Sequence, residues 1–82
     1  MTQPKVLVVD DEPFICRSLT FVLKKGNYDV LEARDGQEAL SAIREHKPDL
    51  VFLDVMMPKI NGFEVTKEVR GDRELDDVTI IL

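Results

Sequence analysis

The chain has 82 residues and a formal net charge of −5, so it is long enough for one small domain and too acidic for a domain that binds the nucleic acid backbone. A hydrophobic fraction of 44% is typical of a folded soluble protein and argues against disorder. The sequence has no signal peptide pattern, and none of its apolar stretches approaches the length of about 20 residues that crosses a membrane. It contains one cysteine, and these features together favour a reducing, cytoplasmic setting.

Four short apolar segments predict strands. Lys5–Val9 and Leu50–Leu53 are apolar without alternation, which is typical of parallel strands covered on both faces. Residues 28–33 form a weaker, mixed segment that suits an edge strand. Residues 78–82 predict a fourth strand at the end of the chain.

Three helical patterns lie between these strands. The first has apolar residues at helical spacing and is followed by Gly26, a typical C-cap. Asp35 and Glu38 form a capping pair at the start of the second. The third is expected between Gly62 and Gly71. Strands and helices therefore alternate, with a strand at each end.

This alternation predicts an α/β fold, in which a doubly wound parallel sheet carries helices on both faces. In such sheets, ligands bind beyond the carboxyl ends of the strands, where the strand order reverses. The residues that follow the first and third strands are Asp10, Asp11 and Asp54. We therefore expect three carboxylates to converge at one place.

Three ionised aspartates at one place repel one another, and a divalent cation removes that repulsion. Oxygen ligands without a nearby His or Cys favour a hard ion, and Mg²⁺ suits a site that keeps water for an incoming phosphate. The ion can offset charge on a transferring phosphoryl group while one carboxylate attacks the phosphorus. The pattern thus indicates Mg²⁺-assisted phosphoryl chemistry.

A structural interpretation is open for Asp11 in particular. It precedes Glu12 and Pro13, and Asp is a good N-cap ahead of a helix that has Pro in its first turn. Asp54 is harder to explain in this way. It ends a strand that looks buried and precedes apolar residues, where a structural carboxylate gains little.

Three motifs resemble the receiver domains of two-component response regulators: VLVVDDE at 6–12, DGQEAL at 35–40 and PDLVFLDVMMPKINGFEV at 48–65. The resemblance implies a flavodoxin-like fold, with strand order 2-1-3-4 in the part present here. It also implies that a histidine kinase or histidine phosphotransferase phosphorylates Asp54. Asp11 and Asp54 would bind Mg²⁺ directly, Asp10 through water and Met56 through its backbone carbonyl. Such a domain catalyses only its own phosphorylation and dephosphorylation and is not otherwise an enzyme.

Receiver domains continue beyond the point that corresponds to Leu82, so residues 1–82 are interpreted as the N-terminal portion of one. The fourth helix, the fifth strand with its phosphate-contacting lysine, and the fifth helix are not in the sequence. We expect an open edge at the fourth strand that could support a homodimer or a domain swap. The alternative function is a non-switching interaction or assembly module. A third candidate, a hydrolase of the haloacid dehalogenase type, would need a second acid two residues after the nucleophilic aspartate, where this sequence has Met56.

The first predicted helix carries two further features. Cys16 projects with Ile15 and Leu19 onto the core side, so we interpret it as a packed thiol. Phe14 and Phe21 project to the opposite side. Since receivers dock on their kinases with the start of this helix, Phe14 and Ile15 are candidate docking residues. Equally, the two Phe side chains could cover a helix outside this sequence. We expect no direct binding to nucleic acid or to a membrane.

Overall fold

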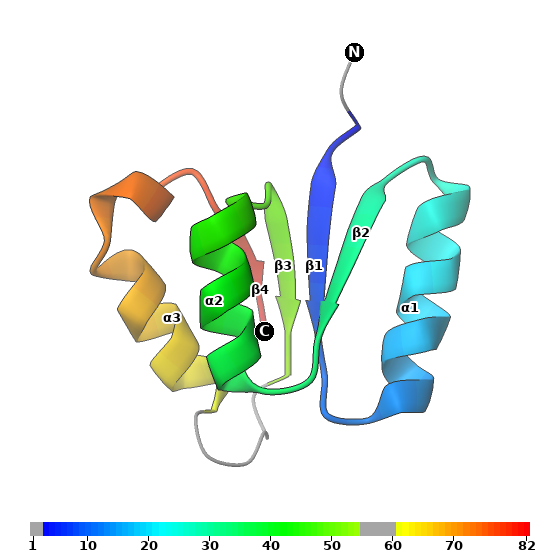
Figure 1. Cartoon of the computed structure of the whole chain (residues 1–82), viewed down its shortest axis with the longest axis horizontal. Helices are drawn as coiled ribbons and strands as arrows, with labels where there is room; N and C mark the ends of the chain where they lie inside the picture. Colours follow the sequence, from blue (N-terminus) through cyan, green and yellow to red (C-terminus); the bar gives the residue numbers. More distant parts are fainter. Residues whose placement is uncertain (1–2, 55–60) are drawn as a thin grey trace.

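The computed structural model describes residues 3–54 and 61–82, in which strands and helices alternate (Figure 1). The strands are β1 (Lys5–Val9), β2 (Asp29–Ala33), β3 (Leu50–Leu53) and β4 (Thr79–Ile81). The helices are α1 (Pro13–Lys25), α2 (Gly36–His46), α3 (Gly62–Arg70) and the short 3₁₀ helix η1 (Arg73–Leu75). The strands are parallel and lie in the order β2-β1-β3-β4. The predicted fold class and strand order are therefore confirmed.

The uninterrupted apolar segments became the central strands. In β1, Val6 to Val9 are all buried, because helices cover both faces of this strand. Its register with β3 pairs Val6 with Leu50 and Val9 with Leu53, so the two strands end side by side. The outer segments gave shorter strands than predicted, since residues 28, 78 and 82 lie outside β2 and β4.

Helices lie on both sides of the sheet. Figure 1 shows α2 and α3 on one side of the molecule and α1 on the other. Residues facing α2 and α3, such as Val9 and Val51, belong to the larger core cluster with Ile43 and Val65. Residues facing α1, such as Val8, form a smaller cluster with Cys16. The larger cluster thus supplies most of the buried apolar area.

Helix α1 is less buried than its apolar spacing predicts. Cys16 is buried, as expected, but Ile15 is 46% exposed and Leu19 36% exposed. The prediction that these two residues belong to a buried stripe was wrong. The reason is that α1 packs on β2 and β1, so its flank toward β3 and β4 has little to pack against among the described residues.

Local hydrogen bonds account for the ends of α2 and α3. The carboxylate of Asp35 accepts a hydrogen bond from the Glu38 N–H at 2.8 Å, which confirms the predicted cap of α2. Asn61, which the sequence reading passed over, caps α3 through the Glu64 N–H. The connection before β4, for which the sequence predicted no helix or strand, contains η1, whose Leu75 is buried.

Among the described residues, none of the helices is long and apolar enough to span a bilayer. Met56, predicted to offer a backbone carbonyl to a metal ion, lies outside the described residues.

Candidate metal centre

Two of the three predicted acids directly follow β1 and β3 and are held in place by pairing with neighbouring strands. The backbone N–H of Asp54 donates to the carbonyl of Val9 at 3.0 Å, and that of Asp10 donates to the carbonyl of Ala33 at 3.2 Å. The ladder therefore continues one residue beyond the strands and holds both backbones in place. Since adjacent strands lie about 4.8 Å apart, side chains at neighbouring strand ends are close to each other.

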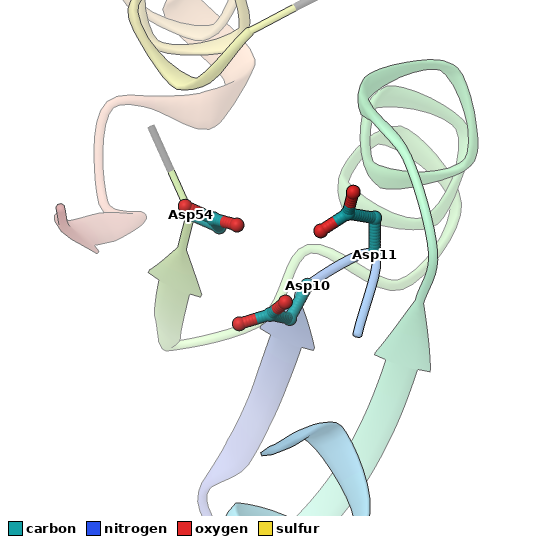
Figure 2. A group of neighbouring side chains, drawn as sticks. All are labelled: Asp10, Asp11 and Asp54. Carbon is teal, nitrogen blue, oxygen red and sulfur yellow. The ribbon is translucent and has the colours of Figure 1, made fainter. Parts of the chain in front are cut away.

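Asp11 completes the group from the bend that leads into α1. Asp10, Asp11 and Asp54 each have a carboxylate oxygen that lies within 4.8 Å of those of the other two. Figure 2 shows Asp11 and Asp54 on opposite sides of the group, with the carboxylate of Asp11 turned toward Asp54 and Asp10 at the end of β1. Asp10 and Asp54 are half-buried and Asp11 is exposed, so the site is open to solvent on the Asp11 side.

The local hydrogen bonds test the structural interpretation of Asp11. The N-cap of α1 is Glu12, and no side chain makes a capping hydrogen bond there. The alternative interpretation of Asp11 as the cap of this helix is therefore wrong. Asp10 instead accepts a hydrogen bond from the Glu12 N–H at 2.9 Å, which orients its carboxylate. A carboxylate has about four acceptor positions, so this bond leaves Asp10 able to accept further ones.

The donor set fits a hard divalent cation. All three groups are carboxylates, and no His or Cys in the described part of the chain joins the cluster. Two oxygens bound to one Mg²⁺ at about 2.1 Å lie at most about 4.2 Å apart. The separations in the structure, within 4.8 Å, therefore call for only small side-chain movements. Binding there would offset the mutual repulsion of the three acids.

An apolar groove of about 180 Å³ opens beside the acids. It continues from Asp10 and Asp54 along the side of the sheet that faces α1. Its apolar lining includes Leu19, Phe52, Ile81 and Leu82. No motif in the sequence predicted this groove.

The candidate docking residues lie close to the acids in the chain. Phe14 and Ile15 are in the first turn of α1, shortly after Asp11, and both are exposed. Phe21 is exposed two turns further along the same helix. The structure therefore presents these side chains at the surface.

Comparison with known families gives a match over almost the whole chain. Residues 6–82 match the family described as "Response regulator receiver domain". The chain is 52% identical, over 69 residues, to the alkaline phosphatase synthesis transcriptional regulatory protein PhoP of Bacillus subtilis. It is 46% identical, over 68 residues, to the DNA-binding response regulator MtrA of Mycolicibacterium smegmatis. The alignments cover 84% and 83% of this chain but only 29% and 30% of these relatives.

Solved structures show the same fold. The chemotaxis response regulator CheY4 of Vibrio cholerae superimposes with a TM-score of 0.91 at 37% identity, covering 96% of this chain and 66% of that one. The response regulator TrrA of Thermotoga maritima, solved in complex with Mg²⁺ and BeF, gives a TM-score of 0.89 at 41% identity. That alignment covers 98% of this chain and 68% of TrrA.

Proposed function

Because the chain belongs to the family of response regulator receiver domains, we propose that Asp54 accepts a phosphoryl group from the phosphohistidine of a histidine kinase or histidine phosphotransferase. The observation that carries this proposal is the convergence of three carboxylates at the adjoining ends of β1 and β3.

In the proposed reaction, a carboxylate oxygen of Asp54 attacks the phosphorus of the donor. The P–N bond to the histidine breaks as the new P–O bond forms, and the electron pair stays on the imidazole nitrogen. The product is an acyl phosphate on Asp54. The backbone hydrogen bond from Asp54 to Val9 holds the nucleophile at the strand end throughout.

Asp10 and Asp11 have the supporting role in this proposal. Together with Asp54 they would hold Mg²⁺, which supplies positive charge against the oxygens of the transferring phosphoryl group. Asp10 is oriented by the Glu12 N–H, so its carboxylate is positioned before a ligand arrives. That TrrA was solved with Mg²⁺ and BeF supports testing the same pair of ligands on this chain.

The test is phosphorylation by acetyl phosphate in the presence of Mg²⁺, followed by intact mass measurement. We expect a gain of one phosphoryl group, which Asp54→Asn abolishes and chelation of Mg²⁺ suppresses. Asp49→Asn is the matched control, because Asp49 immediately precedes the same strand at its other end and is exposed. It should be phosphorylated like the parent protein.

Two results would contradict the proposal. Phosphorylation that persists in Asp54→Asn would place the acceptor elsewhere. Binding of Mg²⁺ without any phosphorylation of the parent protein would instead favour the alternative, a non-switching interaction or assembly module.

We further propose that the first turn of α1 contacts the phosphoryl donor protein, because Phe14 and Ile15 are exposed close to Asp11. Phe14→Asp should slow transfer from a purified cognate kinase while leaving phosphorylation by acetyl phosphate unchanged. The small donor needs no docking surface, so it separates docking from chemistry. An equal loss of phosphorylation rate with the kinase and with acetyl phosphate would contradict a docking role for Phe14.

A further inference from the structure

Arg34 directly follows β2, at the end of the sheet where the three acids gather. Val9 pairs with Ala33 in the β1–β2 ladder, and the backbone N–H of Asp10 donates to the carbonyl of Ala33 at 3.2 Å. Arg34 and Asp10 are therefore the next residues along two adjacent strands, whose backbones lie about 4.8 Å apart. Strand β2 is at the opposite edge of the described sheet from β4, so β4 takes no part in this arrangement.

The side chains of Arg34 and Asp10 belong to the same side of the sheet. Glu32 lies on the α1 side, because its carboxylate accepts a hydrogen bond from the Thr20 hydroxyl of α1 at 2.6 Å. Alternate residues of a strand share a face, which places Arg34 on the side of Glu32, and Asp10 lines the groove on that side. Burial, and then the negative charge of Glu32, raise the pKa of Cys16. Arg34 opposes this rise and Asp10 adds to it, so both charges lie within electrostatic range of that thiol.

Among the described residues, Arg34 has no ion-pair partner, and it is exposed. The two acids nearest to it in the sequence are engaged elsewhere. Glu32 accepts the hydrogen bond from Thr20, and Asp35 accepts one from the Glu38 N–H at 2.8 Å. A cation that neighbouring acids do not neutralise, next to a group of three carboxylates, acts on that group through its charge.

The charge changes at the site indicate what this cation does. Binding of Mg²⁺ brings two positive charges to the acids, whereas phosphorylation of Asp54 makes the site more negative by about one charge. A fixed positive charge opposes the first event and favours the second. We propose that Arg34 is the charge-balancing residue of the site, which weakens the binding of Mg²⁺ and favours the arrival of the phosphoryl group. Only the second effect rests on the function proposed for Asp54.

The exposure of Arg34 sets the size of both effects. Coupling between exposed charges changes an equilibrium or rate constant by about twofold to fivefold. Salt weakens such coupling, because the Debye length falls to about 3 Å at 1 M. The effects of Arg34 should therefore be largest at low ionic strength and should fade at high salt. A residue that supports only the fold would not show this dependence.

Titration with Mg²⁺ at constant low ionic strength, followed by the rise in Tm, tests the first effect without any reaction. Arg34→Gln should bind Mg²⁺ about twofold to fivefold more tightly than the parent protein, and Arg34→Lys should bind it equally. Arg73→Gln is the matched control, because Arg73 is an exposed arginine of η1, at the other end of the sheet from the acids (Figure 1). Its affinity should match that of the parent protein. An unchanged or weaker affinity in Arg34→Gln would overturn the proposal, as would a parent protein that Mg²⁺ does not stabilise.

Phosphorylation by acetyl phosphate, at Mg²⁺ concentrations that saturate each variant, tests the second effect. Acetyl phosphate is an anion, so Arg34→Gln should react about twofold to fivefold more slowly than the parent protein, and Arg34→Glu more slowly still. Tighter Mg²⁺ binding combined with slower phosphorylation is a pair of opposite changes that damage to the fold does not produce. Equal rates in the parent protein and Arg34→Glu would overturn the effect on the phosphoryl group. If the parent protein takes no phosphoryl group but Arg34→Gln binds Mg²⁺ more tightly, the function proposed for Asp54 fails and the effect of Arg34 on the metal site is supported.

Discussion

The two faces of the sheet differ in how completely helices cover them. On the face under α2 and α3, both β3 residues that point to this side, Val51 and Leu53, are buried. On the face under α1, the neighbouring residues Leu50 and Phe52 are only partly buried, and Ile81 of β4 is exposed. Two helices cover the first face, whereas one helix covers the β2–β1 half of the second.

The position of the acids relative to the two faces follows from strand geometry. Successive residues of a strand point to opposite faces, so Asp10 and Asp54 lie on the side of the sheet opposite to Val9 and Leu53. The acids therefore border the less covered face, beside the groove. The well-packed face can meanwhile hold the strand ends in register.

The largest effect should come from the covered face. Ile43 of α2 is fully buried in the larger cluster, so Ile43→Ala should lower the free energy of unfolding by about 2–5 kcal/mol. Val22→Ala, on the exposed side of α1, should change it by less than about 0.5 kcal/mol. Urea unfolding followed by circular dichroism measures both. Comparable losses of unfolding free energy in the two variants would show that the two faces of the sheet contribute equally to stability.

The buried thiol under α1 gives the less covered face a pH-dependent contribution. Burial, and then the negative charge of Glu32, raise the pKa of Cys16 above its ordinary value of 9.0. The folded state therefore holds the thiol proton more tightly than the unfolded state. The stability that this supplies is complete below pH 9.0 and is lost as the pH rises through the raised pKa.

The loss can reach about 1.4 kcal/mol per pH unit between the two pKa values. Urea unfolding of the parent protein and of Cys16→Ala, at pH values below and above the pKa of Cys16, separates the contribution of this thiol from the titration of other groups. The parent should lose more stability than the variant as the pH rises. Parallel curves would mean that the thiol is not desolvated.

The helices of the two faces also differ at their N-termini. Asp35 caps α2 with its side chain, whereas Glu12 at the start of α1 makes no such bond. Asp35→Ala should therefore cost about 1 kcal/mol, and Glu12→Ala should cost close to none. Thermal unfolding of the two variants provides the comparison. A larger loss from Glu12→Ala would indicate a capping interaction at α1 in solution.

Much of this arrangement could be predicted from the sequence. Unbroken apolar segments specify strands buried on both faces, and parallel strands bring their carboxyl ends to one edge, so Asp10 and Asp54 were expected at the same edge of the sheet. That β1 lies beside β3 was expected from the resemblance to receiver domains. The burial of Ile15 and Leu19 was predicted wrongly. Helical spacing shows which residues are apolar, but only the tertiary structure shows whether a neighbour covers them. The 3₁₀ helix η1 was missed because a single turn has too few residues for a periodic pattern.

The smallest effect should come from the ion pair between the helices of the covered face. Arg44 of α2 and Glu68 of α3 approach to 3.6 Å, but both side chains are more than half exposed. Water and salt screen such a pair, so Glu68→Gln should change the free energy of unfolding by less than about 0.5 kcal/mol. Any loss should disappear at high salt, because the Debye length shrinks to about 3 Å at 1 M. A larger, salt-independent loss would mean that electrostatics, and not apolar packing alone, holds α2 to α3.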